Sequence, residues 1–142
     1  MKPEIDQILN LSAMKIIGEF APAMAAQYEQ GMAQVVAGLM LMSAQEYDRA
    51  ADIRVAENQD MRVLFAELAS QISDAGLRGE LEAAAETREG SLRISALNAA
   101  NETLRRLLIR LHAQFDDMGA DASRIWSVLK TMAARRTVTL PG

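Results

Sequence analysis

The chain has 142 residues, of which 50% are apolar and 24% are charged, a balance that suits one folded domain rather than a disordered segment. It contains no cysteine, which excludes disulfides, thiol catalysis and cysteine-bound metal centres. His112 is its one histidine, which excludes a carboxylate-bridged di-iron bundle with a histidine on each of two helices. No catalytic residue, metal or cofactor is expected.

The formal net charge is −4, which argues against a nucleic-acid partner, because such proteins present a basic face. The charge is uneven along the chain. Residues 46–75 carry seven acidic and three basic side chains, whereas residues 119–142 carry one acidic and four basic ones. Two interpretations stay open: ordinary solvated faces, or docking of the C-terminal region on the acidic region of its own or another chain.

Neither a signal peptide nor a membrane span is expected. The first residues lack a basic region followed by an apolar run. The longest apolar run, residues 35–44, is half of the roughly 20 residues that span a bilayer. The sequence therefore predicts a cytoplasmic protein.

The apolar spacing predicts a first helix over residues 3–17, ended by Gly18 and Pro22. The same spacing predicts helix throughout residues 22–74. Ser43 begins a Ser-x-x-Glu sequence that is typical of a helix start, so this stretch is either one helix or two.

The second half contains three further helical stretches. Gly76 is expected to end the preceding helix, and residues 77–90 to form one or two helical turns. Ser91 is expected to begin a helix that stops at Gly119, and Asp121 or Ser123 to begin a last helix that runs to about Arg136. This pattern predicts an all-α fold: an up-and-down bundle of four to five helices over residues 1–136, with a long antiparallel helical hairpin joined by residues 76–90. Residues 137–142 are expected to form an extended tail.

An internal repeat is the clearest signal in the sequence. When residues 56–72 are shifted by 43 positions onto residues 99–115, six of 17 positions are identical and apolar residues replace one another between them. Asn58 falls on Asn101, and Arg62 on Arg105. A duplicated helix and the convergence of two helices on one pattern both explain it.

The second copy of the repeat is a regular heptad pattern, with a polar Asn101 among its core positions. A polar residue there fixes the register and partner number of helices. Either the two asparagines bond to their neighbours, or they fix the register of a dimer. The predicted partner or oligomer interface comprises Asn58, Asn101, Leu104, Leu108 and Leu111.

Four arginines of the repeat suggest a second kind of site. Arg62, Arg105, Arg106 and Arg110 could contact an anion or the head group of a ligand, or could pair with Glu102 and the acidic residues nearby. The first half of the chain is also rich in methionine, which either fills the core or forms an adaptable groove for a partner helix or an acyl chain.

Residues 5–24, IDQILNLSAMKIIGEFAPAM, are followed by Tyr28 and by an Ala/Met/Val-rich helix that reaches Glu46. With Leu9, Ile17, Glu19 and Pro22, this stretch resembles a family of small all-helical bacterial proteins of unknown function. Members are often encoded beside acyl-CoA dehydrogenases and aminoglycoside-phosphotransferase-like kinases. Residues 91–112, SLRISALNAANETLRRLLIRLH, resemble the C-terminal helix of related proteins. The resemblance implies an accessory or binding role near acyl-CoA metabolism and no catalytic residue.

These observations favour a non-catalytic helical-bundle protein that acts through protein–protein contact, as a homodimer or an accessory subunit. Two alternatives remain: a module that binds an apolar or acyl ligand, and a small acidic protein of the export-chaperone type.

Overall fold

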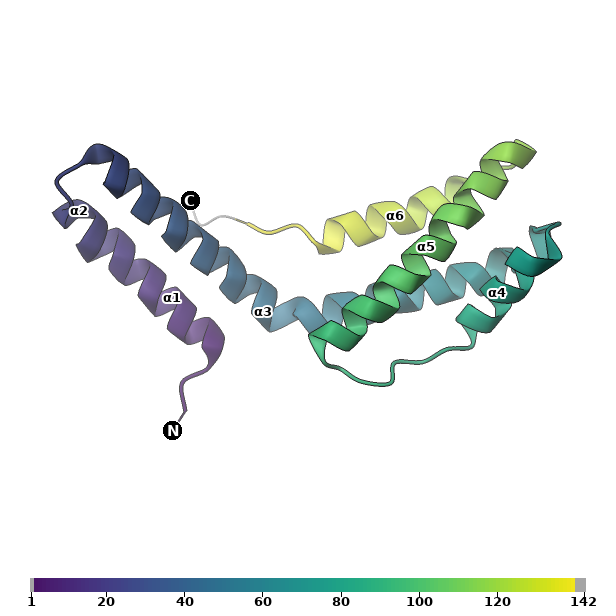
Figure 1. Ribbon diagram of the computed structural model, residues 1–142, viewed down its shortest axis with the longest axis horizontal. Helices are drawn as coiled ribbons and strands as arrows, with labels where there is room; N and C mark the ends of the chain where they lie inside the picture. The colour runs from purple at the N-terminus through teal and green to yellow at the C-terminus, as the bar shows by residue number, and fades with distance from the viewer. Residues whose placement is uncertain (1, 140–142) are drawn as a thin grey trace. The chain divides into compact units, whose positions relative to one another are not determined.

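The computed structural model describes residues 2–139, and every regular element in this range is helical (Figure 1). The sequence predicted one domain over residues 1–136, whereas contacts divide the chain into two compact units. Unit 1 comprises residues 2–50 with residues 138 and 139, and unit 2 comprises residues 51–137. The division falls within one helix, so no break in the helical pattern marks it.

Unit 1 begins with α1 (Ile5–Lys15), which continues without a break into a π-helical turn (Ile16–Phe20) and α2 (Ala21–Ala23). Gly18 and Pro22 therefore do not end the helix at the predicted place. Gly18 lies inside the π-helical turn, and Pro22 lies in α2, directly after this turn. The helix ends at Met24, where the backbone becomes extended.

The second helix of unit 1 is the first half of α3 (Gln27–Leu68), a single helix of 42 residues. Ser43 begins no new helix: its hydroxyl donates to the carbonyl oxygen of Leu39 at 2.8 Å, a bond within the helix. Of the two alternatives for residues 22–74, one helix or two, the structure has one, but this helix is shorter than expected because residues 24–26 and 72–74 are not helical. The two helices of unit 1 meet through Ala13, Ala37 and Leu41, with Ile16 and Met40 packed against them.

Unit 2 begins with the second half of α3, which ends in a 3₁₀ turn (Ala69–Gln71). The next helix, α4 (Ala75–Ala85), is longer than the one or two turns predicted. Asp74 begins α4, because its carboxylate accepts the backbone N–H of Leu77 at 2.7 Å. Gly76 therefore lies in the first turn of α4 and does not end the preceding helix.

The last two helices are α5 (Ile94–Met118) and α6 (Ser123–Arg135). Gly119 ends α5 as predicted, in a left-handed conformation (φ 61°) that favours glycine. Asp121 accepts the backbone N–H of Ser123 at 2.9 Å, which supports the start of α6. Residues 137–139 have no regular structure, and the rest of the predicted tail, residues 140–142, lies outside the described residues.

The helices of unit 2 alternate in direction, as in an up-and-down bundle (Figure 1). The all-α bundle is confirmed, but residues 76–90 do not join two long antiparallel helices, because α3 and α5 run parallel. Hydrogen bonds join Arg54 to Asn98 and Asn58 to Asn101, at nearly constant separations of 44 and 43 residues. The cause is α4, which carries the chain back along α3 before α5 starts.

Large side chains from all four helices of unit 2 form one apolar core. Among the fully buried ones are Met61, Leu64 and Phe65 of α3, Leu81 of α4, Leu111 and Phe115 of α5, and Ile125 of α6.

Candidate functional site

The parallel arrangement of α3 and α5 brings the two copies of the internal repeat side by side. The contact offset of Asn58 and Asn101 is 43 residues, which equals the offset of the repeat. The amide of Asn101 donates to the side-chain oxygen of Asn58 at 2.9 Å, and both residues are buried. The asparagines therefore fix a helix register inside one chain, in the way that a polar core residue does between chains.

Each asparagine also donates to a glutamate. The arginine four residues after each asparagine takes part in the same cluster of hydrogen bonds. Asn101 donates to Glu57 Oε2 at 3.1 Å, and Arg105 Nε donates to Asn101 Oδ1 at 2.9 Å. The guanidinium of Arg105 lies 3.6 Å from Glu57 Oε2. Glu57 is fully buried, and Arg136 of the segment after α6 donates to both its oxygens, at 2.6 and 2.7 Å.

The asparagine and the arginine of the first copy of the repeat bind a second glutamate, Glu89, in a similar manner. Asn58 donates to Glu89 Oε1 at 3.0 Å, and Arg62 donates to the same oxygen at 2.6 Å. Arg62 is itself buried, and its Nε donates to the hydroxyl of Thr87 at 2.9 Å. We did not predict Glu57, Glu89 or Arg136 as members of this network. The available signal was the shared Asn-x-x-x-Arg spacing of the two copies.

Electrostatics hold Glu57 in its ionised form. Burial alone would raise the pKa of this carboxyl group. The hydrogen bonds and charge of Arg136, the charge of Arg105 and the amide of Asn101 outweigh burial and place its pKa below the usual range. A charged, fully bonded carboxylate stabilises the arrangement around it and is poorly suited to accept a proton at neutral pH.

The residues predicted to form an interface lie in the interior of unit 2. Asn58, Asn101, Leu104, Leu108 and Leu111 are all buried against helices of their own chain. Their contact with a second chain stays a prediction, and the structure gives these side chains an internal role instead.

The arginines that were candidates for anion binding are paired with carboxylates. On the surface, Arg106 donates to Glu102 at 2.5 Å, and Arg110 donates to both oxygens of Glu80 at 2.5 and 3.0 Å. Arg62 and Arg105 belong to the buried network. The structure thus agrees with the alternative in which these arginines pair with Glu102 and nearby acidic residues.

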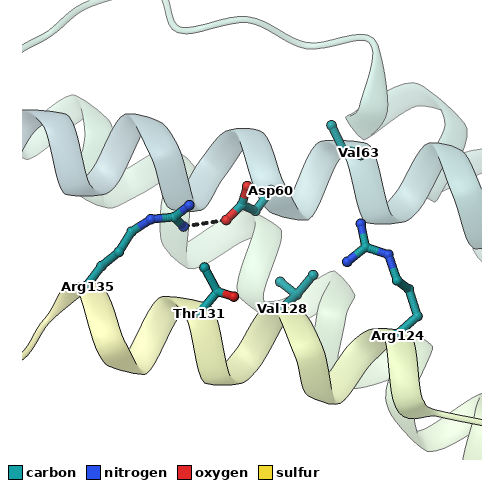
Figure 2. Close-up of a pocket in the computed structure, with 6 residues that line it drawn as sticks. All are labelled: Asp60, Val63, Arg124, Val128, Thr131 and Arg135. Atoms are coloured by element: carbon teal, nitrogen blue, oxygen red, sulfur yellow. Dashed lines mark hydrogen bonds and ion pairs between the residues drawn. The ribbon is translucent and has the colours of Figure 1, made fainter.

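Further ion pairs join α6 to the acidic half of α3, and Figure 2 shows one of them, between Arg135 and Asp60. Arg124 binds Glu67 at 2.8 and 3.2 Å, and Arg135 binds Asp60. Between these pairs is a small open cavity of about 160 Å³, and its lining includes Val63 of α3 and Val128 and Thr131 of α6. The uneven charge of the sequence therefore corresponds to docking of the C-terminal region on the acidic region of its own chain.

His112 packs at the edge of the bundle. Its ring meets that of Trp126 edge to face, with centroids 5.1 Å apart. It is partly buried, and its Nε2 lies 3.8 Å from Asp116 Oδ1.

Unit 1 presents a different surface, because its large apolar side chains point outward. Of the 18 large apolar side chains that are exposed among residues 2–139, 12 lie within the first 50 residues. On α3 they include Tyr28, Met32, Val35 and Leu39, with exposures of 78%, 46%, 55% and 57%. Steps of four, three and four residues place them on one face of the helix, away from Ala37 and Leu41, which contact α1.

Two glycines leave gaps between the large side chains of this face. Gly31 and Gly38 lie two helical turns apart, and a Cβ atom at either position would have no neighbour within 4 Å. With Gln34, Val35, Leu39 and Met42 they line an open groove of about 390 Å³. Each glycine inside a helix costs about 1 kcal/mol relative to alanine, and no contact inside the described residues requires either of them. We call the face of Tyr28, Gly31, Met32, Val35, Gly38, Leu39 and Met42 the outer face of α3.

Among residues 2–139, no cluster of three or more side chains has the composition of a metal site, and no helix is long and apolar enough to cross a membrane. Comparison of the chain with family models, with curated proteins and with solved structures finds no match.

Proposed function

We propose that this chain is a non-catalytic helical protein that acts by contact with another protein, as a homodimer or as an accessory subunit. The observation that carries the proposal is the exposed apolar surface of unit 1. The large apolar side chains there form a continuous stripe on α3, and a contiguous apolar patch of several hundred Å² is often a functional surface. Such a surface is typical of a protein-binding site.

The charged side chains support the same proposal. A general acid or base works best with a pKa near the operating pH. Here the buried Glu57 has a pKa shifted downward by Arg136 and its neighbours, and Arg110 shifts the pKa of the exposed Glu80 in the same direction. These carboxylates stabilise the fold by pairing with arginines. We place the protein in the cytoplasm, where chains without disulfides are usual.

Native mass spectrometry of the protein purified from its own host tests the proposal. We expect an even multiple of the chain mass, or a complex with a second protein. A bound mass of a few hundred daltons that is lost in organic solvent would instead favour the ligand-binding alternative. A strict monomer at every concentration, with neither a protein partner nor a bound molecule, would contradict the proposal.

A further inference from the structure

The outer face of α3 has a self-complementary pattern. A second copy of the helix can be placed antiparallel to the first, with Val35 opposite Val35 of the second copy. Any two residues that then face each other have numbers that add up to 70. Gly31 then faces Leu39 of the second copy, and Met32 faces its Gly38. A large side chain lies opposite a glycine at both levels, and Tyr28 lies opposite Met42 at the ends.

Such a pairing has the symmetry of a twofold interface, in which residue i contacts residue j and residue j contacts residue i. The pairing also gives the two glycines a role. In the single chain the space above each of them is open, and in the pair a side chain of the second copy fills it. Small residues let two helices approach closely, and the large side chains of the facing helix fill the remaining space.

The charge of this face favours a second copy as well. No residue between Glu29 and Glu46 is charged, a stretch of α3 that includes the whole groove. Two copies therefore meet without opposing like charges along the groove. The flanking residues are acidic rather than basic, which disfavours an anionic lipid surface as the occupant.

The size of the face suits a modest dimer. The exposed parts of its large side chains amount to roughly 500 Å², compared with about 800 Å² per partner in an interface of standard size. Burying the whole face on both copies would form a contact at the weak end of the range of protein interfaces. We therefore expect a dimer that depends on protein concentration.

We propose that the outer face of α3 is the contact surface for a second copy of this chain, paired antiparallel about Val35. The inference rests on the proposed function and names its partner. It concerns unit 1 only, and the asparagines of unit 2 take no part in it.

A cross-linking experiment tests the register. The natural chain has no cysteine, so Val35→Cys introduces a single thiol at the twofold axis. Under mild oxidation we expect this variant to form a disulfide-linked dimer nearly completely. The matched control is Leu11→Cys, an apolar position on α1 that is more exposed than Val35 and lies outside the proposed face.

Glycine substitutions test the close approach. We expect the double substitution Gly31→Leu and Gly38→Leu to weaken dimerisation at least tenfold in sedimentation velocity, because each leucine occupies the space of the facing side chain. Gly79→Leu is the matched control: Gly79 also lies within a helix with no neighbour within 4 Å, but on α4 in unit 2. Circular dichroism should show that all variants remain helical.

The outcomes separate this inference from the proposed function. A dimer that survives both glycine substitutions and does not cross-link at Val35 would overturn the inference, while the chain would still act by self-association. A monomer that binds a different protein would overturn the inference and leave the accessory role in place. A monomer without any partner would overturn both.

Discussion

Residues 2–50 and residues 51–137 are both built from helices, but the first unit exposes most of its large apolar side chains whereas the second buries most of them. In unit 2, four helices surround Phe65, Leu111 and Phe115 and bury them completely. In unit 1, two helices meet through Ala13, Ala37 and Leu41, and the larger residues remain exposed. An apolar stripe thus shows that one face of a helix needs a packing partner. The number of neighbouring helices in the chain decides whether that face is buried within the chain or left exposed.

The largest expected effect is the loss of a core side chain from unit 2. Phe65→Ala should lower the free energy of unfolding by about 4 kcal/mol, because it leaves a cavity among residues that cannot collapse freely. The matched change in unit 1, Leu39→Ala, should cost less than about 0.5 kcal/mol in the monomer, since this side chain is exposed.

Urea denaturation at low protein concentration measures both variants, with circular dichroism for the whole chain and Trp126 fluorescence for unit 2. Equal losses for Phe65→Ala and Leu39→Ala would contradict the distinction between the two units.

A smaller effect is expected at the buried carboxylate. Glu57→Gln should cost about 2 kcal/mol at neutral pH, because the variant keeps the shape of the side chain but loses its charge beside Arg136 and Arg105. The pKa of Glu57 is lower in the folded chain than its ordinary value of 4.5. Its contribution to stability is therefore fully present above that value and is lost as the pH falls through the folded pKa.

Unfolding measured from neutral to acidic pH should show the difference between wild type and Glu57→Gln shrinking in acid. Glu102→Gln is the control, since Glu102 pairs with Arg106 on the exposed surface. A difference that stays constant with pH would show that the charge of Glu57 does not stabilise the fold.

The smallest effect is expected for a surface ion pair. Arg106→Gln should change the free energy of unfolding by about 0.3 kcal/mol, because solvent and salt screen an exposed pair four residues apart on a helix. Arg62→Gln removes a buried partner of Glu89 and should cost several times more. Thermal unfolding of both variants at low and high salt compares them, and similar losses would contradict the assignment of Arg62 to the core.

Local signals predicted parts of the fold well. The heptad spacing of residues 94–118 predicted α5, and Gly119 marked its end because a left-handed residue there favours glycine. The prediction that Gly76 ends a helix was wrong, because Asp74, two residues earlier, caps the start of a new helix with its side chain. Glycine after a helix and aspartate before one are opposite signals, and here they overlap within three residues.

Tertiary partners were harder to predict. The stripe through Tyr28, Val35 and Leu39 resembles that through Met61, Phe65 and Leu68, yet only the second is buried. Periodicity shows which residues share a face and does not show what covers them. The direction of α5 differs from the expected one for a related reason: the 43-residue offset of the repeat is also the contact register of α3 and α5, which sequence similarity alone does not reveal.

The connection between α4 and α5 has a further consequence for local opening. Residues 86–93 have no regular structure, and such segments usually exchange their amide hydrogens early. Glu89, however, lies in this connection and holds the buried guanidinium of Arg62 and the amide of Asn58. If the connection opened alone, the buried guanidinium of Arg62 would lose its carboxylate partner in an apolar interior. We therefore expect the connection to open only when the helices around it unfold.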